Sequence, residues 1–124
     1  MKFTFGKQEK LKSRKAIEQL FIEGTSVSSY PMRLVFLKQN HGGEAPVKLG
    51  LSVPKKKFNK AVDRNRIKRV LREVYRKNKH TFVKELDGQY IAMLLYLDSK
   101  EWDQEALTKK MQKLAEKFLE KTKL

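Results

Sequence analysis

The chain contains no cysteine among its 124 residues, so a disulfide framework and a thiolate metal site are both excluded. It also lacks any apolar run that reaches the ~18 residues a membrane-spanning helix needs. Its first residues, from Met1 to Gly6, lack the apolar stretch of a secretory signal. These absences together predict a cytoplasmic protein.

Acidic residues are scarce as well. The chain has 14 Asp and Glu against 29 Lys and Arg, which gives a net charge of +15. Because 40% of the residues are hydrophobic, residues 1–124 are predicted to form one folded domain rather than a disordered basic tail. A domain this basic repels itself, and binding to a polyanion relieves the repulsion. Nucleic acid is the first hypothesis for that partner, and an acidic membrane surface is the second.

Apolar periodicity predicts a single α+β domain with the order αβββαβα. Residues 90–97 form a nearly continuous apolar run, which predicts a buried central strand. Residues 40–46 contain two glycines and a proline, which predicts a long hairpin loop between two strands. The expected helices span 13–24, 61 to 77–78 with an uneven continuation towards 86, and 103–121; the expected strands span 25–29 (a turn or a short strand), 32–38, 47–53 and 90–97.

Residues 54–79 hold 12 of the 29 Lys and Arg residues, against only Asp63 and Glu73. At about 100° per residue, the helix in this segment has one apolar face, and Arg64 lies at its border. Arg66 falls on the opposite flank, beside Glu73. The apolar face holds Ile67, Val70, Leu71, Val74 and Tyr75, and the face predicted to point to solvent holds Asn65, Lys68, Arg69, Arg72, Arg76 and Lys79.

A run of charge on a helix is commonly just a solvated face. Solvated faces usually mix signs at i,i+4, whereas this face stacks like charges three and four residues apart, which is unfavourable without an anion. Arginine also grips phosphate with two parallel hydrogen bonds. The face as a whole is therefore predicted to bind nucleic acid, while the role of each single residue stays open.

The run Lys55-Lys56, Ala61-Val62, Arg64-Asn65-Arg66-Ile67-Lys68-Arg69 and Arg72-Glu73 resembles the signature of the bacterial ribonuclease P protein component. Leu11-Lys12, Ile17, Leu20-Phe21 and Gly24 resemble the first helix of that family, and residues 49–53 resemble the strand before the signature. The resemblance covers essentially the whole chain. It implies an α-β sandwich with a mixed sheet and a left-handed βαβ crossover, a fold type shared with a domain of a small-subunit ribosomal protein.

The resemblance also implies a function. The family's protein is the small subunit of an endoribonuclease whose RNA is the catalyst, and the enzyme removes the 5′ leader of precursor tRNA. The expected partners are therefore the catalytic RNA and precursor tRNA, with no membrane and no small-molecule cofactor. The protein alone is expected to be inactive and to hold no metal or cofactor, while Mg²⁺ is needed in the assembled enzyme and is held mainly by RNA.

The resemblance assigns two sets of site residues and no catalytic residue. Two departures bear on them: Ile17 stands where many relatives have Phe, and Asn59-Lys60 occupies a turn where many relatives have Gly. The set expected to bind the catalytic RNA is Lys55, Lys56, Lys57, Lys60, Arg64, Asn65, Arg66, Lys68, Arg69, Arg72 and Arg76, and the set expected to line a leader cleft is Lys12, Arg14, Ile17, Phe21, Val35, Phe36 and Ser52.

Other interpretations stay open. Phe21 and Phe36 are each, taken alone, better read as core residues than as stacking platforms, and Phe3 and Phe5 are expected to pack against the body. Trp102 is expected to staple the last helix. A general or ribosome-associated RNA-binding module would explain the charge without an enzyme. A protein-only nuclease is disfavoured because His41 and His80 have no evident partner and the acids are scattered.

Overall fold

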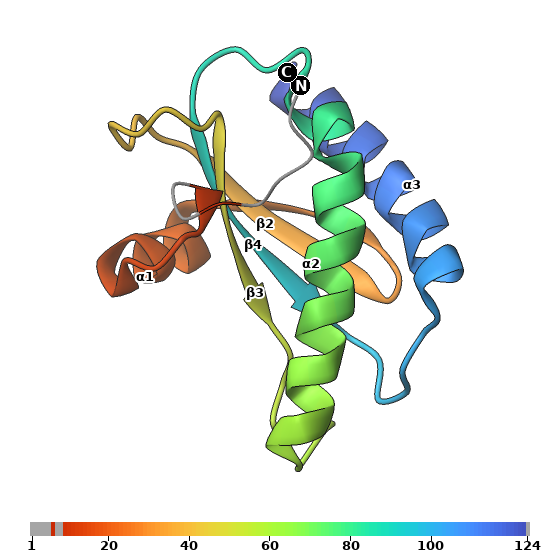
Figure 1. Ribbon diagram of the computed structural model, residues 1–124. Helices are drawn as coiled ribbons and strands as arrows, with labels where there is room; N and C mark the ends of the chain where they lie inside the picture. The colour runs from red at the N-terminus through yellow and green to blue at the C-terminus, as the bar shows by residue number, and fades with distance from the viewer. Residues whose placement is uncertain (1–5, 7–8, 124) are drawn as a thin grey trace.

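The computed structural model describes residue 6 and residues 9–123, so the expected packing of Phe3 and Phe5 lies outside the described residues. Four strands form one mixed sheet in the order β1-β2-β4-β3. Helices α2 and α3 lie on one side of this sheet and α1 on the other (Figure 1). The elements are α1 Arg14–Glu23, β1 Thr25–Ser29, β2 Met32–Lys38, β3 Val47–Ser52, α2 Ala61–Val83, β4 Tyr90–Tyr96 and α3 Gln104–Thr122, which confirms the predicted order.

The helix ends form where the sequence predicts them. The Ser13 hydroxyl accepts a hydrogen bond from the Ala16 N–H, and the Gly24 N–H donates to the Leu20 carbonyl at 2.8 Å, so α1 is capped at both ends. Helix α2 runs to Val83, within the predicted continuation towards residue 86. The continuation is stabilised by Phe82, which is buried between α2 and α3 and extends the apolar face by one more turn.

The predicted hairpin between residues 32–38 and 47–53 is wrong. Strand β4 lies between β2 and β3, pairing antiparallel with β2 and parallel with β3. The hairpin is instead formed by β1 and β2, which turn at Tyr30-Pro31. Residues 90–97 are confirmed as the central strand, because an almost wholly apolar strand is most stable where both faces and both edges are covered.

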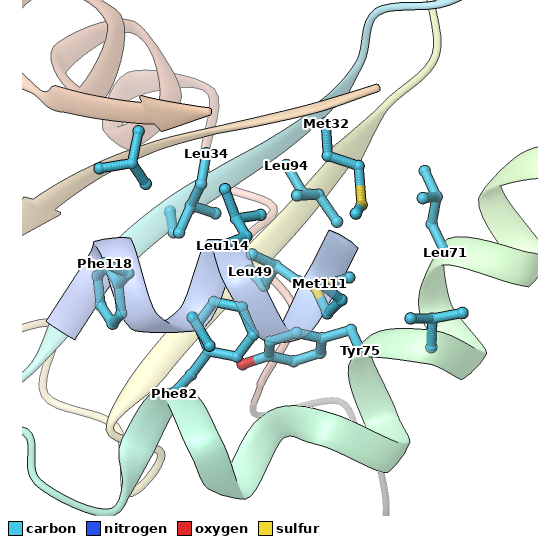
Figure 2. Close-up of a cluster of buried hydrophobic side chains, with 14 of the residues drawn as sticks. Met32, Leu34, Leu49, Leu71, Tyr75, Phe82, Leu94, Met111, Leu114 and Phe118 are labelled. Atoms are coloured by element: carbon cyan, nitrogen blue, oxygen red, sulfur yellow. The ribbon is translucent and has the colours of Figure 1, made fainter. Parts of the chain in front are cut away.

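The two faces of the sheet carry cores of different size. The face towards α2 and α3 packs most of the buried side chains (Figure 2). There Phe118 of α3 is in ring contact with Phe36, Phe82 and Tyr90. The face towards α1 carries only a small cluster, with partly buried side chains around it. That cluster consists of Leu11, Leu20, Val35, Ile91 and Met93.

Candidate nucleic-acid interface

The basic connector, residues 54–60, forms a turn ahead of α2. The Pro54 carbonyl accepts hydrogen bonds from the backbone N–H groups of Lys57 and Phe58, both at 3.3 Å. Phe58 is buried and its ring lies 6.1 Å from the ring of Tyr96, so the connector is anchored to the sheet by one aromatic side chain. The four lysine side chains of the connector are exposed: Lys55, Lys56, Lys57 and Lys60.

Arg64 is turned back onto this connector. Its guanidinium donates from the same nitrogen, Nη1, to the Phe58 carbonyl at 2.7 Å and to the Asn59 carbonyl at 3.1 Å. Arg64 therefore holds the connector turn against the first turn of α2. The helical projection predicted the half-buried position of Arg64 at the border of the apolar face but not these acceptors.

Arg66, predicted on the helix flank that also carries Glu73, is ion-paired with two other acids. Its Nη2 lies 2.6 Å from Glu101 Oε2 and 2.7 Å from Asp63 Oδ1. The hydrogen bonds to these two acids raise the pKa of Arg66 above its ordinary range, and the bond to Glu101 has the larger effect. In return, the Arg66 guanidinium lowers the pKa of Glu101. Glu73 pairs with Arg76 instead, and that guanidinium lowers the pKa of the Glu73 carboxyl.

The exposed face of α2 is smaller than the six residues predicted for it. Asn65, Arg69 and Arg72 are exposed and Lys68 is half-buried, and among the described residues no carboxylate forms an ion pair with Arg69 or Arg72. An arginine without a carboxylate partner keeps its donors available for phosphate.

Lys79 is not on this face, and its predicted exposure is wrong. Its side chain is buried, and its Nζ donates to Glu9 Oε1 at 2.9 Å and to Glu9 Oε2 at 2.8 Å. The segment around Glu9 reaches α2 because the next residue, Lys10, forms a bridge with Leu49 of β3. The helical projection places Lys79 away from the apolar face of α2, but it cannot show that the segment around Glu9 covers this position.

The second predicted site lies on the α1 side of the sheet. Phe21 is 51% exposed on α1, Ile17 is half-buried, and Val35 lies beneath the helix in the small cluster. Ser52 shares this face with Val35, because their partners on β4, Leu95 and Met93, are two residues apart. The first turn of the helix adds cations: Lys12 and Arg14 are both exposed.

Phe36 does not belong to this site. It is buried on the opposite face of the sheet, with its ring 4.8 Å from the ring of Phe118. Adjacent residues of a strand point to opposite faces, so Val35 and Phe36 cannot line the same cleft. The interpretation of Phe36 as a core residue is confirmed, and its assignment to the leader cleft is wrong.

The acidic loop between β4 and α3, residues 97–103, is held together by polar contacts. Trp102 Nε1 donates to Asp98 Oδ2 at 2.7 Å, which lowers the pKa of the Asp98 carboxyl. The Asp103 carboxylate caps α3 by accepting from the Ala106 N–H at 2.8 Å. Trp102, the residue before the α3 N-cap, is thus fastened to Asp98, and its role as a hydrophobic staple stays a prediction.

The described part of the chain holds no group of three or more His, Cys, Asp or Glu side chains placed to bind a metal ion. The Mg²⁺ implied by the family resemblance thus has no evident protein ligand set among these residues. None of the described helices combines the length and the apolarity that crossing a membrane requires.

A small α+β domain with one strongly basic helix face has the features of a nucleic-acid-binding protein. The family model described as Ribonuclease P matches residues 5–119. The chain belongs to the ribonuclease P protein family. The resemblance found in residues 55–73 is thereby confirmed.

Two curated relatives, each named ribonuclease P protein component, give the range of similarity. The protein of Pseudoalteromonas translucida is 34% identical over 121 residues, which cover 98% of this chain and 81% of the relative. The protein of Porphyromonas gingivalis is 44% identical over 79 residues, which cover 62% of this chain and 58% of the relative. The matched part thus spans less than two thirds of the Porphyromonas relative's length.

Solved structures confirm the predicted fold class. The RNase P protein from Thermotoga maritima superposes with a TM-score of 0.71 at 25% identity, covering 88% of this chain and 96% of that one. A Staphylococcus aureus RNase P protein structure gives a TM-score of 0.70 at 19% identity, covering 87% and 93%, and this likeness concerns the fold alone.

Proposed function

We propose that this chain is the protein subunit of ribonuclease P and acts in the cytoplasm. In this role it binds the catalytic RNA and the 5′ leader of precursor tRNA, so that the RNA removes the leader and leaves the mature 5′ end. The observation that carries the proposal is a pair of exposed arginines, Arg69 and Arg72, on the signature helix of a ribonuclease P family member; neither has a carboxylate partner among the described residues. The neighbouring connector adds four exposed lysines to the same basic surface.

The leader is assigned to the α1 side of the sheet. Single-stranded RNA is held where cations lie beside aromatic or flat apolar platforms. The exposed ring of Phe21 supplies a platform, and Lys12 and Arg14 supply the charge. Ser52 and the half-buried Leu95 leave the neighbouring part of the sheet accessible to solvent.

The chemistry of cleavage belongs to the RNA. We find no pair of groups in the described residues that suits acid–base cleavage of a phosphodiester. His41 Nδ1 accepts a hydrogen bond from the Gly43 N–H and is committed to its own loop. Mg²⁺ is expected in the assembled enzyme, held by RNA, and the protein's part is to bind and orient the two RNAs.

Cleavage of precursor tRNA at low Mg²⁺ tests the proposal directly. A bacterial ribonuclease P RNA is incubated with the substrate in the presence and absence of the protein, and the protein is also assayed alone. We expect cleavage at the mature 5′ end only when RNA and protein are both present. If the protein binds RNA but does not stimulate cleavage by a cognate RNA, a general RNA-binding module is the better description. Cleavage by protein alone would instead indicate a nuclease.

The salt dependence of RNA binding tests the phosphate contacts separately. If about five cations contact phosphates, the logarithm of the association constant should fall with the logarithm of salt concentration at a slope of roughly −3 to −4. The Arg69→Gln variant should have a shallower slope. A response that does not change with salt would contradict an electrostatic interface.

A further inference from the structure

Arg66 lies beside the β4–α3 loop, about 60° around α2 from Arg69. At about 100° per residue it lies about 120° around the helix from Arg72, on the flank that faces the β4–α3 loop. There it forms a fork with Glu101: Nε donates to Oε1 at 2.7 Å and Nη2 donates to Oε2 at 2.6 Å. The same Nη2 reaches Asp63 Oδ1 at 2.7 Å. A single carboxylate therefore takes the two parallel bonds that a phosphate would otherwise take.

Tyr96, the last residue of β4, braces the loop that carries Glu101. The Tyr96 hydroxyl donates to the Lys100 carbonyl at 2.5 Å and accepts from the Trp102 N–H at 3.1 Å. Lys57 of the connector also donates from its Nζ to the Leu97 carbonyl. The loop is therefore attached to the first turns of α2 and to the connector, and also to the β1–β2 turn, where the Leu97 N–H donates to the Pro31 carbonyl at 2.7 Å and the Trp102 ring lies 6.1 Å from that of Tyr30.

These contacts divide the arginines of the signature into two groups. Arg64 holds the connector and Arg66 holds the β4–α3 loop, both through acceptors of the protein itself. Arg69 and Arg72 have no carboxylate partner among the described residues. The central Arg-Asn-Arg triplet thus combines two fastened side chains with one exposed amide, Asn65.

We propose that Arg66 is a positioning residue rather than a phosphate contact. Its pair with Glu101 fastens the β4–α3 loop to α2 and holds the connector lysines in the arrangement that meets RNA, while Arg69 and Arg72 contact the phosphates. The inference rests on the proposed function, because it takes the catalytic RNA as the partner. It assigns Glu101, an acidic residue in an RNA-binding protein, a supporting role in RNA binding.

Two substitutions that keep the net charge test this role. Arg66→Lys loses the planar fork, and Glu101→Asp shortens the carboxylate arm, but neither changes the overall electrostatic attraction to RNA. Affinity of the full chain for a bacterial ribonuclease P RNA is measured by filter binding over a series of salt concentrations. We expect each variant to bind about twofold to fivefold more weakly, the range that an exposed ion pair supports. The double variant should bind no more weakly than the weaker single variant.

The salt slope distinguishes positioning from contact. We expect both variants to keep the slope of the unmodified protein, whereas the control Arg69→Gln should make it shallower by about 0.7–0.9, the value of one phosphate contact. Glu105→Asp is the matched control for Glu101→Asp, because Glu105 is an exposed acid near the same loop without an ion pair among the described residues. It should leave the affinity unchanged.

If Arg66 contacts phosphate, Glu101→Asp releases it, and affinity then stays the same or rises; either result overturns the proposal. A shallower slope for Arg66→Lys, or unchanged affinity in both variants, overturns it as well. Thermal unfolding of the free single and double variants measures the coupling between Arg66 and Glu101 in the absence of RNA. Additive losses of stability from the two substitutions would mean that the two side chains do not interact, which would contradict the proposal. If the unmodified chain does not bind ribonuclease P RNA, the proposed function is overturned instead. The unfolding measurements on the single and double variants then still decide whether the Arg66–Glu101 ion pair stabilises the protein.

Discussion

The two faces of the sheet are built from the same strands but are covered very differently. Helices α2 and α3, with 23 and 19 residues, cover one face, whereas α1, with 10 residues, lies on the other. On the α2–α3 side the strands bury Leu34, Ala92 and Tyr96 almost completely. On the α1 side Leu95 and Ser52 stay half-buried. One face therefore supplies most of the stability, and the other keeps surface that a ligand can reach.

The exposed residues of α1 support this division. Phe21 is 51% exposed and Ile22 is 82% exposed, although the sheet beside them still has accessible surface. Removing these side chains from water would stabilise the fold, because apolar burial contributes about 25 cal/mol for each Å². The α1 side is thus better suited to binding than to stability, and substitutions should separate the two properties.

The largest effect is expected from Phe118→Ala on the α2–α3 side. Phe118 is 1% exposed and contacts three other aromatic rings. Its truncation should lower the free energy of unfolding by about 3–5 kcal/mol, measured by denaturant titration, because the surrounding rings cannot collapse into the cavity. RNA binding should be lost only in proportion to unfolding. A stable, folded variant with weak RNA binding would contradict the division between the faces.

The next largest effect is expected from Leu20→Ala on the α1 side. Leu20 is fully buried, but its cluster has only four other buried members, and accessible surface lies nearby. The free energy of unfolding should fall by about 2–3 kcal/mol, at the low end of the range for such substitutions, because a small cluster relaxes more easily. A loss as large as that of Phe118→Ala in the same titration would show that the two faces contribute equally.

Much of the fold follows from local rules that the sequence carries openly. Ser13 and Gly24 bound α1, and the apolar run at residues 90–97 identifies the central strand. Strand pairing does not follow from such rules. Residues 32–38 and 47–53 are neighbours in the chain, but β4, which comes after a 23-residue helix, enters between them. Only the tertiary structure reveals that insertion.

The candidate site divides in the same way. Periodicity predicts the basic face of α2, and Asp63 is a partner of Arg66 within the helix. The other partner of Arg66, Glu101, and the partner of Lys79, Glu9, lie 35 and 70 residues away in the chain, so these two pairings could not be predicted from the helix. The position of Phe36, by contrast, follows from the sequence alone. Adjacent residues of a strand point to opposite faces of the sheet, so only one of Val35 and Phe36 can lie on the α1 side.

A smaller effect is expected from Phe21→Ala, and it should appear in binding rather than in stability. Because half of the ring is exposed, the free energy of unfolding should change by less than about 1 kcal/mol, whereas a lost base-stacking contact is worth about 1–3 kcal/mol. The assembled enzyme should lose affinity for precursor tRNA but not for mature tRNA. Ile22→Ala, on the adjacent and more exposed position, is the control and should change neither. A variant that only unfolds more easily would identify Phe21 as core.

The smallest effect is expected from pH and concerns His41, in the loop before β3. Burial lowers the pKa of His41, and Lys48 lowers it further, while the Ala45 carbonyl opposes the shift. Lys48 points to the α1 side, since it alternates with the buried Val47 and Leu49. A folded-state pKa below the unfolded value of 6.5 means that the native state prefers the neutral ring, whose Nδ1 accepts from the Gly43 N–H.

His41 should therefore stabilise the protein fully above about pH 6.5, and this contribution should be lost as the pH falls below that value. Denaturant titrations at a series of pH values should show a decline in acid that is shallower in His41→Gln. The α2–α3 side should respond at the two extremes of pH instead. Its ion-paired and hydrogen-bonded carboxyls, Glu73, Asp98 and Glu101, have lowered pKa values, so their contribution is lost only in stronger acid. Burial raises the pKa of Tyr96 to about 12, so its contribution persists below pH 10 and fades towards 12. If the free energy of unfolding falls equally with pH in the unmodified protein and in His41→Gln, the protonation of His41 is not coupled to folding. The two faces would then not differ in their response to pH near neutrality.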